Sequence, residues 1–197
     1  MGKNTIPCVF MIESNSLEDE KAGRKEGQIL SDILRMLNKD VEYRYIRTEK
    51  ELGTMVHEFA QSNYRYLHIA SHGEKGRFHL TLDVVPYRKF AQIAGPYLTD
   101  RRLFLSVCSI ARLALAEEVY RVSRPTSITG PRNVIGFSES AAVWVSLYSL
   151  LFNENPDAIS GETIREYLRK LCRLHGVRFA HYGRVKGPPH FRAFKFG

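Results

Sequence analysis

The chain has few cysteines and no long apolar run. Its three cysteines, Cys8, Cys108 and Cys172, are spread over 197 residues without a C-x-x-C spacing. This excludes a small disulfide scaffold and gives no support for a zinc site. No apolar run approaches the roughly 18 residues of a membrane helix, and the first residues lack the apolar core of a signal peptide. We therefore expect a soluble, cytoplasmic protein with reduced thiols and no membrane partner.

The sequence also lacks internal repeats, low-complexity tracts and heptad runs. Its 44% hydrophobic residues and its length predict one domain over residues 1–197. The net charge is +8, and nine Lys or Arg against three Asp or Glu from residue 157 onward supply +6 of it. A basic tail, residues 177–197, mixes these charges with aromatic residues. Because no nucleic-acid motif accompanies them, the aromatic residues favour packing over nucleic-acid binding.

Apolar runs alternate with helical patterns along the chain, which predicts an α/β fold with a mostly parallel central sheet and helices on both faces. The segment 73–85 predicts a small excursion or hairpin, and residues 121–132 predict an exposed loop, for which three roles stay open: a border of the cleft, a site of processing, or a plain surface connection. The expected strands are 6–12, 41–46, 64–71, 102–107, 134–137 and, as the last one, 177–182; the expected helices are 29–37, 49–62, 87–97, 113–120, 141–152 and 160–175.

Two of the predicted strands end in reactive side chains. The block 64–73 ends in His72-Gly73, and the block 102–109 ends in Cys108-Ser109. Ligands of α/β sheets bind at the carboxyl ends of the strands, so we expect the imidazole and the thiol to meet there if the strands are neighbours. The histidine would then act as general base and acid, and Cys108 as the nucleophile. The backbone N–H groups of Gly73 and Cys108 are the expected oxyanion donors. This chemistry requires neither metal nor cofactor.

A family resemblance follows from these blocks. The run Leu67 to Gly73, followed by Leu103 to Ser109, resembles the His-Gly and cysteine blocks of caspase-like cysteine peptidases, particularly the CHAT and separase branch. The resemblance implies a caspase-hemoglobinase fold and an endopeptidase with a His72–Cys108 dyad and a thioester intermediate. Related proteins include regulated proteases of prokaryotic defence and of cell death. By analogy, we expect an effector protease that a protein partner activates.

The residue preferred at the cleavage position is open. A pocket for a basic side chain needs an acid, for which Glu139, Glu74 and Asp19 are candidates. A pocket for aspartate needs an arginine, for which Arg77, Arg112 and Arg132 are candidates. We prefer Glu139, with Ser140 beside it, because related peptidases build their specificity pocket just past the fifth strand.

Two other functions stay open at this point. The chain could be a catalytically inactive CHAT-like module that binds a protein or nucleic-acid partner through its basic face, or a cysteine hydrolase of small amides. For single residues we expect ordinary structural roles. Cys8 and Cys172 lie within apolar patterns and predict core thiols, and His68 predicts a core histidine rather than a metal ligand.

Overall fold

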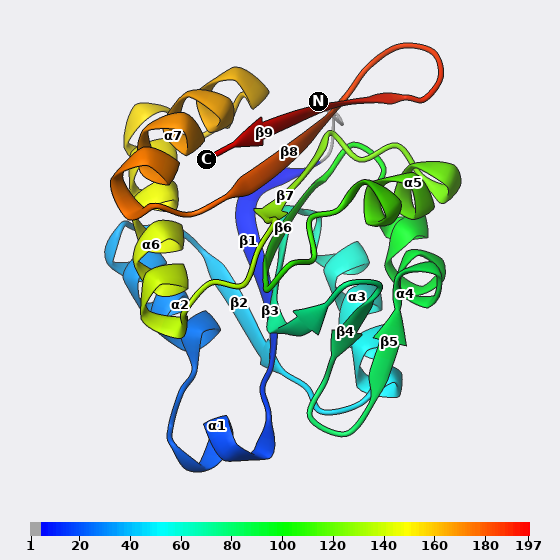
Figure 1. Ribbon diagram of the computed structural model, residues 1–197, viewed down its shortest axis with the longest axis vertical. Coiled ribbons are helices and arrows are strands. Elements are labelled where there is room, and N and C mark those ends of the chain that lie inside the picture. Colours follow the sequence, from blue (N-terminus) through cyan, green and yellow to red (C-terminus); the bar gives the residue numbers. More distant parts are fainter. Residues whose placement is uncertain (1–4) are drawn as a thin grey trace.

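A computed structural model describes residues 5–197 and is built around one central sheet (Figure 1). The strand order is β2-β1-β3-β6-β7-β8-β9; the first five strands run parallel, β8 runs antiparallel to β7, and β9 runs antiparallel to β8. This arrangement confirms the predicted mostly parallel α/β fold. The strands are β1 (Ile6–Ser14), β2 (Val41–Tyr45), β3 (Tyr64–Glu74), β6 (Arg102–Val107), β7 (Ser127–Pro131), β8 (Phe179–Arg184) and β9 (Phe191–Phe196).

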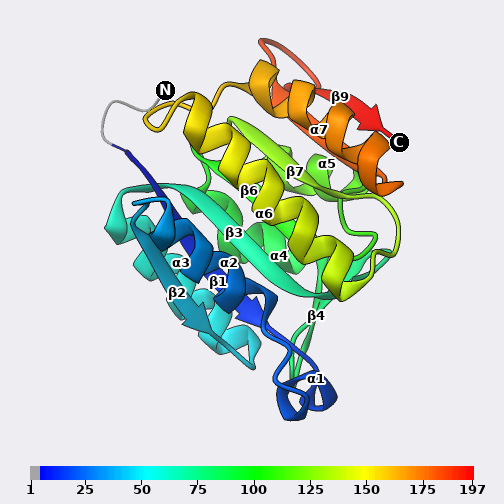
Figure 2. The same cartoon turned by 90° about the vertical axis from the view of Figure 1, so that its left-hand side faces the viewer.

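Helices cover both faces of the sheet (Figures 1 and 2). On one face lie α2 (Glu26–Met36), α6 (Phe137–Glu154) and α7 (Gly161–His175), and on the other lie α3 (Glu49–Ser62), α4 (Tyr87–Ala94), the 3-10 turn η1 (Gly95–Tyr97) and α5 (Leu113–Val122). Each layer has its own hydrophobic core: Trp144 and Phe104 belong to the first, Phe59 and Phe90 to the second. The sheet is therefore buried on both sides, which explains the continuous apolar runs of its central strands.

Local signals set the ends of several helices. The side chains of Thr48 and Glu51 form a capping box that starts α3, and Ser160 Oγ accepts a hydrogen bond from Thr163 N at 2.9 Å to start α7. Gly176 ends α7 with φ of 66°, a left-handed conformation that glycine adopts without a steric cost. These caps explain why the ranges 49–62 and 160–175 were predicted well.

Strand β3 extends further than predicted and continues into a hairpin. Its last residues pair antiparallel with β4 (Arg77–His79), which in turn pairs with β5 (Val84–Pro86). His72 therefore lies within β3, opposite His79, rather than just beyond the strand. The predicted hairpin at 73–85 is confirmed. Together with the short helix α1 (Leu17–Lys21), it projects from the lower end of the sheet in Figure 1.

The predicted fifth strand was wrong, and so was the loop before it. Residues 134–137 form no strand; Val134 is 75% exposed and α6 begins at Phe137. The strand is β7, within the predicted loop 121–132, where Ser127 and Thr129 are buried. Their hydroxyls bond Arg102 and His181 on neighbouring strands, so a polar-looking segment is satisfied only by tertiary contacts.

The predicted last strand, 177–182, is present, but it is longer than predicted and is not the last strand of the sheet. Strand β8 runs on to Arg184, and β9 follows it within the basic tail as the edge of the sheet. Phe191 and Phe196 at the two ends of β9 are buried, while Arg192 and Lys195 are exposed. The aromatic residues of the tail thus pack, as expected, and its charged residues face solvent.

Within residues 5–197, no helix is long and apolar enough to cross a membrane. The same residues contain no group of three or more His, Cys, Asp or Glu side chains that could hold a metal ion. All three thiols are free; Cys8 and Cys172 are buried, as predicted, and Cys108 is half-buried. His68 is fully buried and contacts Trp144 and Tyr148, which confirms its place in the core.

Candidate active site

His72 and Cys108 follow equivalent positions of two hydrogen-bonded strands. Strands β3 and β6 are parallel neighbours, and Ser71 pairs with Val107 in their register. His72, within β3, and Cys108, in the turn after β6, directly follow this pair. Both side chains line one cavity at the carboxyl end of the sheet. The strands that carry His72 and Cys108 are therefore neighbours in the sheet.

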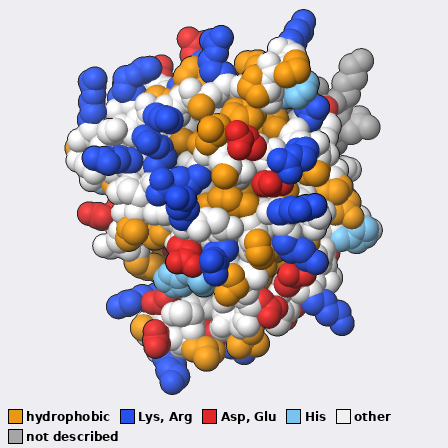
Figure 3. All heavy atoms as spheres, turned by 45° about the vertical axis from the view of Figure 1, so that its right-hand side comes forward, with side chains coloured by type: hydrophobic (Ala, Val, Ile, Leu, Met, Phe, Trp, Pro, Cys, Tyr) orange, Lys and Arg blue, Asp and Glu red, His pale blue; other side chains and the backbone are white. Residues whose placement is uncertain are grey.

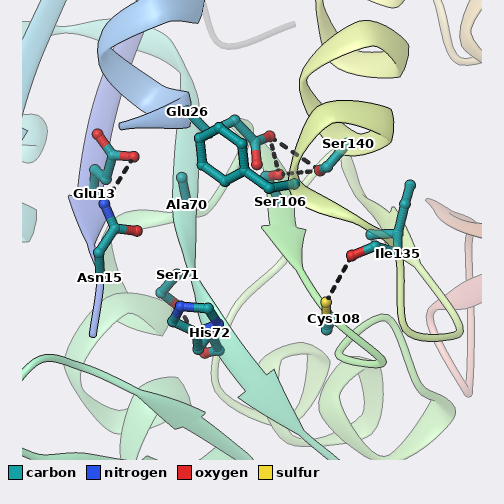
Figure 4. Close-up of a pocket in the computed structure, with 11 residues that line it drawn as sticks. Glu13, Asn15, Glu26, Ala70, Ser71, His72, Ser106, Cys108, Ile135 and Ser140 are labelled. Atoms are coloured by element: carbon teal, nitrogen blue, oxygen red, sulfur yellow. Dashed lines mark hydrogen bonds between the residues drawn. The ribbon is translucent and has the colours of Figure 1, made fainter. Parts of the chain in front are cut away.

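The Cys108 thiol lies half-buried at a sharp turn. Its Sγ atom is 3.4 Å from the carbonyl oxygen of Ile135, which points to it from the segment before α6 (Figure 4). Ser109, the next residue, has φ of 54°, in the left-handed region that favours glycine. Its N–H donates to Asn133 O at 3.0 Å, which holds the turn in place. Hydrogen bonds around the turn thus fix the backbone that presents the thiol.

The His72 ring is oriented by a carboxylate from another part of the chain. Its Nε2 atom lies 2.5 Å from Oδ2 of Asp19 in α1, the segment that follows β1. The Asp19 carboxylate also accepts hydrogen bonds from the Ser16 hydroxyl at 2.8 Å and from Arg24 NH1 at 3.0 Å, while the backbone N–H of Asp19 donates to Ser16 Oγ at 3.1 Å. Burial by itself raises the pKa of Asp19, but hydrogen bonds from Ser16, His72 and Arg24 outweigh it and lower the pKa.

The ionised Asp19 has a consequence for the histidine tautomer. A carboxylate at Nε2 accepts a hydrogen bond, so it holds the proton of the neutral ring on Nε2. The other ring nitrogen, Nδ1, has no hydrogen-bond partner among residues 5–197. The His72 side chain is 53% exposed. Nδ1 is therefore available as a proton acceptor for a thiol or a substrate.

Gly73 lies directly against the cysteine turn. A Cβ atom on Gly73 would lie 2.3 Å from Cγ1 of Val107 and 3.4 Å from the carbonyl oxygen of Cys108. Only the bare backbone of glycine fits this approach between β3 and β6. The close packing brings the backbones of Gly73 and Cys108, the two predicted oxyanion donors, to the same place.

The cavity that His72 and Cys108 share is narrow and acidic at its inner end. Its volume is about 80 Å³. Figure 4 shows Glu26, Ser106 and Ser140 on the side of the cavity away from His72 and Cys108. These three side chains come from α2, β6 and α6, so the cavity reaches from the sheet edge down between two helices.

Glu26 is held by two hydroxyl groups. Ser140 Oγ donates to Glu26 Oε1 at 3.0 Å, Ser106 Oγ donates to the same oxygen, and the two hydroxyl oxygens are 2.8 Å apart. The pKa of Glu26 is raised to about 7: burial raises it most, the hydrogen bonds from Ser106 and Ser140 lower it, and the nearby charge of Glu13 adds a smaller increase.

Glu13, the other acid of the cavity, is fully buried at the end of β1. It accepts hydrogen bonds from the backbone N–H groups of Gly27 at 2.9 Å and Gln28 at 3.2 Å and from Tyr43 OH at 2.7 Å. Its carboxylate therefore caps the N-terminus of α2, where backbone N–H groups without a partner inside the helix favour an anion. This role ties α2, and Glu26 with it, to the central strand.

The other predicted specificity residues lie at different places. Of these, Ser140 lines the cavity and Asp19 contacts His72. Glu139 is exposed, and its carboxylate accepts from Gly136 N at 3.3 Å at the start of α6. Glu74 is exposed and pairs with Arg77 and His79. Neither Arg112 nor Arg132 is among the residues that line the cavity.

Sequence reasoning missed the acids that reach the site from the first third of the chain. The sequence marks Asp19 only as a candidate pocket acid, and it does not mark Glu13, Glu26 or Ser106 as site residues. The one signal for Glu26 was its position at the start of a helical pattern, where acids are common. Its burial against Ser106 and Ser140 is a contact between residues 80 and 114 positions apart, which no local pattern carries.

Comparisons with known proteins identify the fold. No family model and no curated protein matches the sequence. Among solved structures, the secreted C11 cysteine protease iotapain from Bacteroides thetaiotaomicron is similar with a TM-score of 0.61 and 11% identity over 91% of this chain. Caspase-1 from Spodoptera frugiperda is similar with a TM-score of 0.56 and 12% identity over 98% of this chain and 87% of its own.

A further C11 structure agrees with these two. An inactive zymogen C11 protease from Parabacteroides distasonis has a TM-score of 0.57 at 9% identity, over 93% of this chain and 63% of its own. The present chain covers 66% of iotapain, slightly less than two thirds of its length. At these identities the comparisons establish the caspase-like fold.

Proposed function

We propose that this chain is a caspase-like cysteine endopeptidase in which Cys108 is the nucleophile and His72 the general base and acid. The observation that supports this most is the shared cavity: the two side chains follow paired positions of adjacent strands and line the same space. Similarity to cysteine proteases at the level of the fold agrees with the proposal. It extends to peptide substrates, which enter at the carboxyl end of the sheet.

The proposed reaction begins with proton transfer from the Cys108 thiol to Nδ1 of His72. The thiolate attacks the carbonyl carbon of the scissile peptide bond, and the negative charge that develops on oxygen is bound by the N–H groups of Gly73 and Cys108. His72 then gives its proton to the leaving nitrogen, the C–N bond breaks and a thioester remains. Water, activated by His72, attacks the thioester and releases the acid product with the thiol restored.

Asp19 acts in this scheme as a positioning residue. It holds the proton on Nε2, so that Nδ1 enters each cycle as the acceptor, and it stabilises the imidazolium that forms. The carboxylate itself is fixed by Ser16 and Arg24, so its geometry does not depend on the histidine alone.

A larger opening beside His72 offers room for a peptide. This second cavity has a volume of about 580 Å³ and lies between α1 and the β4–β5 hairpin. His72 lines both cavities, so a chain bound in the larger opening passes the dyad and can place one side chain in the narrow acidic cavity. This arrangement favours an endopeptidase over a hydrolase of small amides.

Within caspase-like proteases, the order and spacing of the two blocks favour the CHAT and separase branch, and we retain this branch as part of the proposal. The free thiols agree with a reducing, cytoplasmic setting. Activation by a protein partner remains an inference by analogy.

The alternative, an inactive module that binds through its basic face, finds less support. On the face that Figure 3 shows, Lys and Arg side chains are interspersed with acidic and apolar side chains. An acidic macromolecule would more readily select a continuous basic surface.

The proposal is tested by the rate at which iodoacetamide alkylates the thiols at neutral pH, followed by peptide mass spectrometry. Cys108 should react rapidly, and His72→Ala should slow its alkylation to the rate of an ordinary thiol. Cys8 and Cys172 are internal controls, because burial raises the pKa of both thiols, that of Cys172 to about 11. Equal, slow labelling of all three cysteines would contradict a catalytic thiol.

A further inference from the structure

Glu26 is a buried acid whose charge has no counterpart in the protein. The residue is 8% exposed, and none of the ion pairs of residues 5–197 includes Glu26 or its neighbour Glu13. Both serine hydroxyls bind Oε1, whereas Oε2 of Glu26 has no hydrogen-bond partner among the described residues. Glu26 therefore keeps one free acceptor at the inner end of the cavity.

An arrangement of this kind is unfavourable when the cavity holds only water. Buried carboxylates are normally paired with a cation, because a charge removed from water is costly. The raised pKa of Glu26, which burial causes, reflects that cost. The carboxylate of Glu13 accepts hydrogen bonds from backbone N–H groups at the N-terminus of α2. The carboxylate of Glu26, by contrast, has only the neutral hydroxyl groups of Ser106 and Ser140 as partners. A cation that enters the cavity would supply the missing partner.

The size of the cavity suits one extended side chain. A cavity needs about 10–15 Å³ in this measure to hold a water molecule, so the 80 Å³ here correspond to a handful of water-sized groups. The side chains of lysine and arginine are unbranched chains of this size with a positive end. Ala70 and Ile135 among the lining residues give the methylene groups apolar contacts.

From the burial, the free acceptor and the cavity, we propose that Glu26 is the specificity-determining residue of this site and binds the basic side chain, Lys or Arg, that precedes the cleaved bond. Its carboxylate receives the ammonium or guanidinium group, and the hydroxyls of Ser106 and Ser140 complete the polar end. The inference rests on the proposed peptidase function and adds its substrate class.

Other side chains fit this cavity less well. An aspartate in the substrate would face two acids, Glu26 and Glu13, without an arginine among the residues that line the cavity. A large apolar side chain would bury the free acceptor of Glu26 without any partner. A glutamine has the right length but brings no positive charge. These three side chains define the comparison peptides for the test.

The experiment measures kcat/KM for peptides that differ only in the residue before the cleaved bond: lysine, arginine, glutamine, leucine or aspartate. The lysine or arginine peptide should be cleaved best. The Glu26→Gln variant should lose about 10- to 100-fold for these two peptides, the size expected for one charge-assisted hydrogen bond, with no comparable loss for the glutamine peptide. Glu139→Gln is the matched control, since Glu139 is an exposed acid close by that lines neither cavity; it should leave all five rates unchanged.

A second readout separates this inference from the proposed function. Iodoacetamide needs no specificity pocket, whereas a peptide chloromethyl ketone that ends in lysine does. If both reagents label Cys108 rapidly in the wild type and Glu26→Gln slows only the lysine reagent, both proposals hold. Rapid, His72-dependent labelling by iodoacetamide together with a preference for aspartate or leucine would overturn the role of Glu26 and leave the catalytic thiol intact. Slow labelling of Cys108 by iodoacetamide would overturn both the catalytic thiol and the role of Glu26.

The melting temperature of Glu26→Gln is the control for folding. An unchanged melting temperature shows that the variant is folded.

Discussion

His72 and Asp19 are joined by a hydrogen bond of 2.5 Å between Nε2 and Oδ2, although 53 positions separate them in the sequence. The contact links the end of β3 to the short helix α1, which follows β1. It occupies Nε2 of His72 and leaves Nδ1 without a hydrogen-bond partner among residues 5–197. A helix of one turn, held by the Ser16 cap, is thus part of the proposed catalytic machinery.

We expect Asp19→Asn to lower kcat by about 10- to 100-fold, because it replaces a charge-assisted hydrogen bond by a neutral one, and to leave KM nearly unchanged. Steady-state kinetics on one good peptide measures the two constants. Arg24→Gln is the matched control: it removes another partner of Asp19 but keeps the His72 contact. A rise in KM without a fall in kcat would indicate that Asp19 shapes the substrate cleft instead.

Gly73→Ala should damage the site through crowding. The added methyl group would lie 2.3 Å from Cγ1 of Val107, and overpacking of this kind costs about 1–3 kcal/mol of stability. Urea unfolding measures the loss. The double variant Gly73→Ala with Val107→Ala removes the clashing atom and should recover part of the stability and of the Cys108 alkylation rate. Equal losses in the single and double variants would show that the methyl group clashes elsewhere.

Glu26 should make the protein less stable as the pH rises. Burial raises its pKa to about 7 in the folded state, against an ordinary value of 4.5 for a glutamate, so between these values the folded state binds more protons than the unfolded state. Stability then falls from about pH 4.5 to pH 7, by up to about 3 kcal/mol. Urea unfolding of wild type and Glu26→Gln at pH 5 and pH 8 tests this. The free energy of unfolding of Glu26→Gln, compared with that of the wild type, should be higher at pH 8 than at pH 5. The same change in unfolding free energy with pH in both proteins would contradict the prediction.

The buried histidine His68 should act in the opposite direction at lower pH. Burial lowers its pKa to about 3, from the ordinary value of 6.5 for a histidine, so the unfolded state binds the proton first as the pH falls. Stability present above about pH 6.5 is lost down to pH 3, by up to roughly 5 kcal/mol. The double variant His68→Phe with Tyr148→Phe removes the histidine and the hydroxyl that bonds its Nδ1 at 3.0 Å.

This double variant should shift the acid-unfolding midpoint, followed by circular dichroism, to lower pH. His181, which is also buried with a pKa of about 3, remains in place and keeps part of the acid sensitivity. Tyr148→Phe alone is the control for the lost hydroxyl. A midpoint that is the same in the wild type and the double variant would show that His68 does not limit acid stability.

The elements with local signals were predicted well from the sequence. The capping box of α3, the caps of α7 and the apolar runs of β1, β3 and β6 depend on residues a few positions apart. Strand β7 was missed because its buried hydroxyls are satisfied by Arg102 and His181 from other strands. Gly130 is a second reason why β7 was missed. A Cβ atom there would lie 2.7 Å from Leu105 O, so β7 packs against β6 only with a glycine at this position, and a glycine in the sequence locally indicates a turn.

The sequence by itself determined the α/β class and the two strand ends that carry His72 and Cys108, because periodicity and strand termini are local properties. Only the tertiary structure decided which acids join them. Asp19 meets His72 because β1 and β3 are parallel neighbours, and Glu26 meets Ser106 because α2 packs over the sheet beside α6. These contacts form only when segments distant in the sequence pack together, so the spacing of residues along the chain does not predict them.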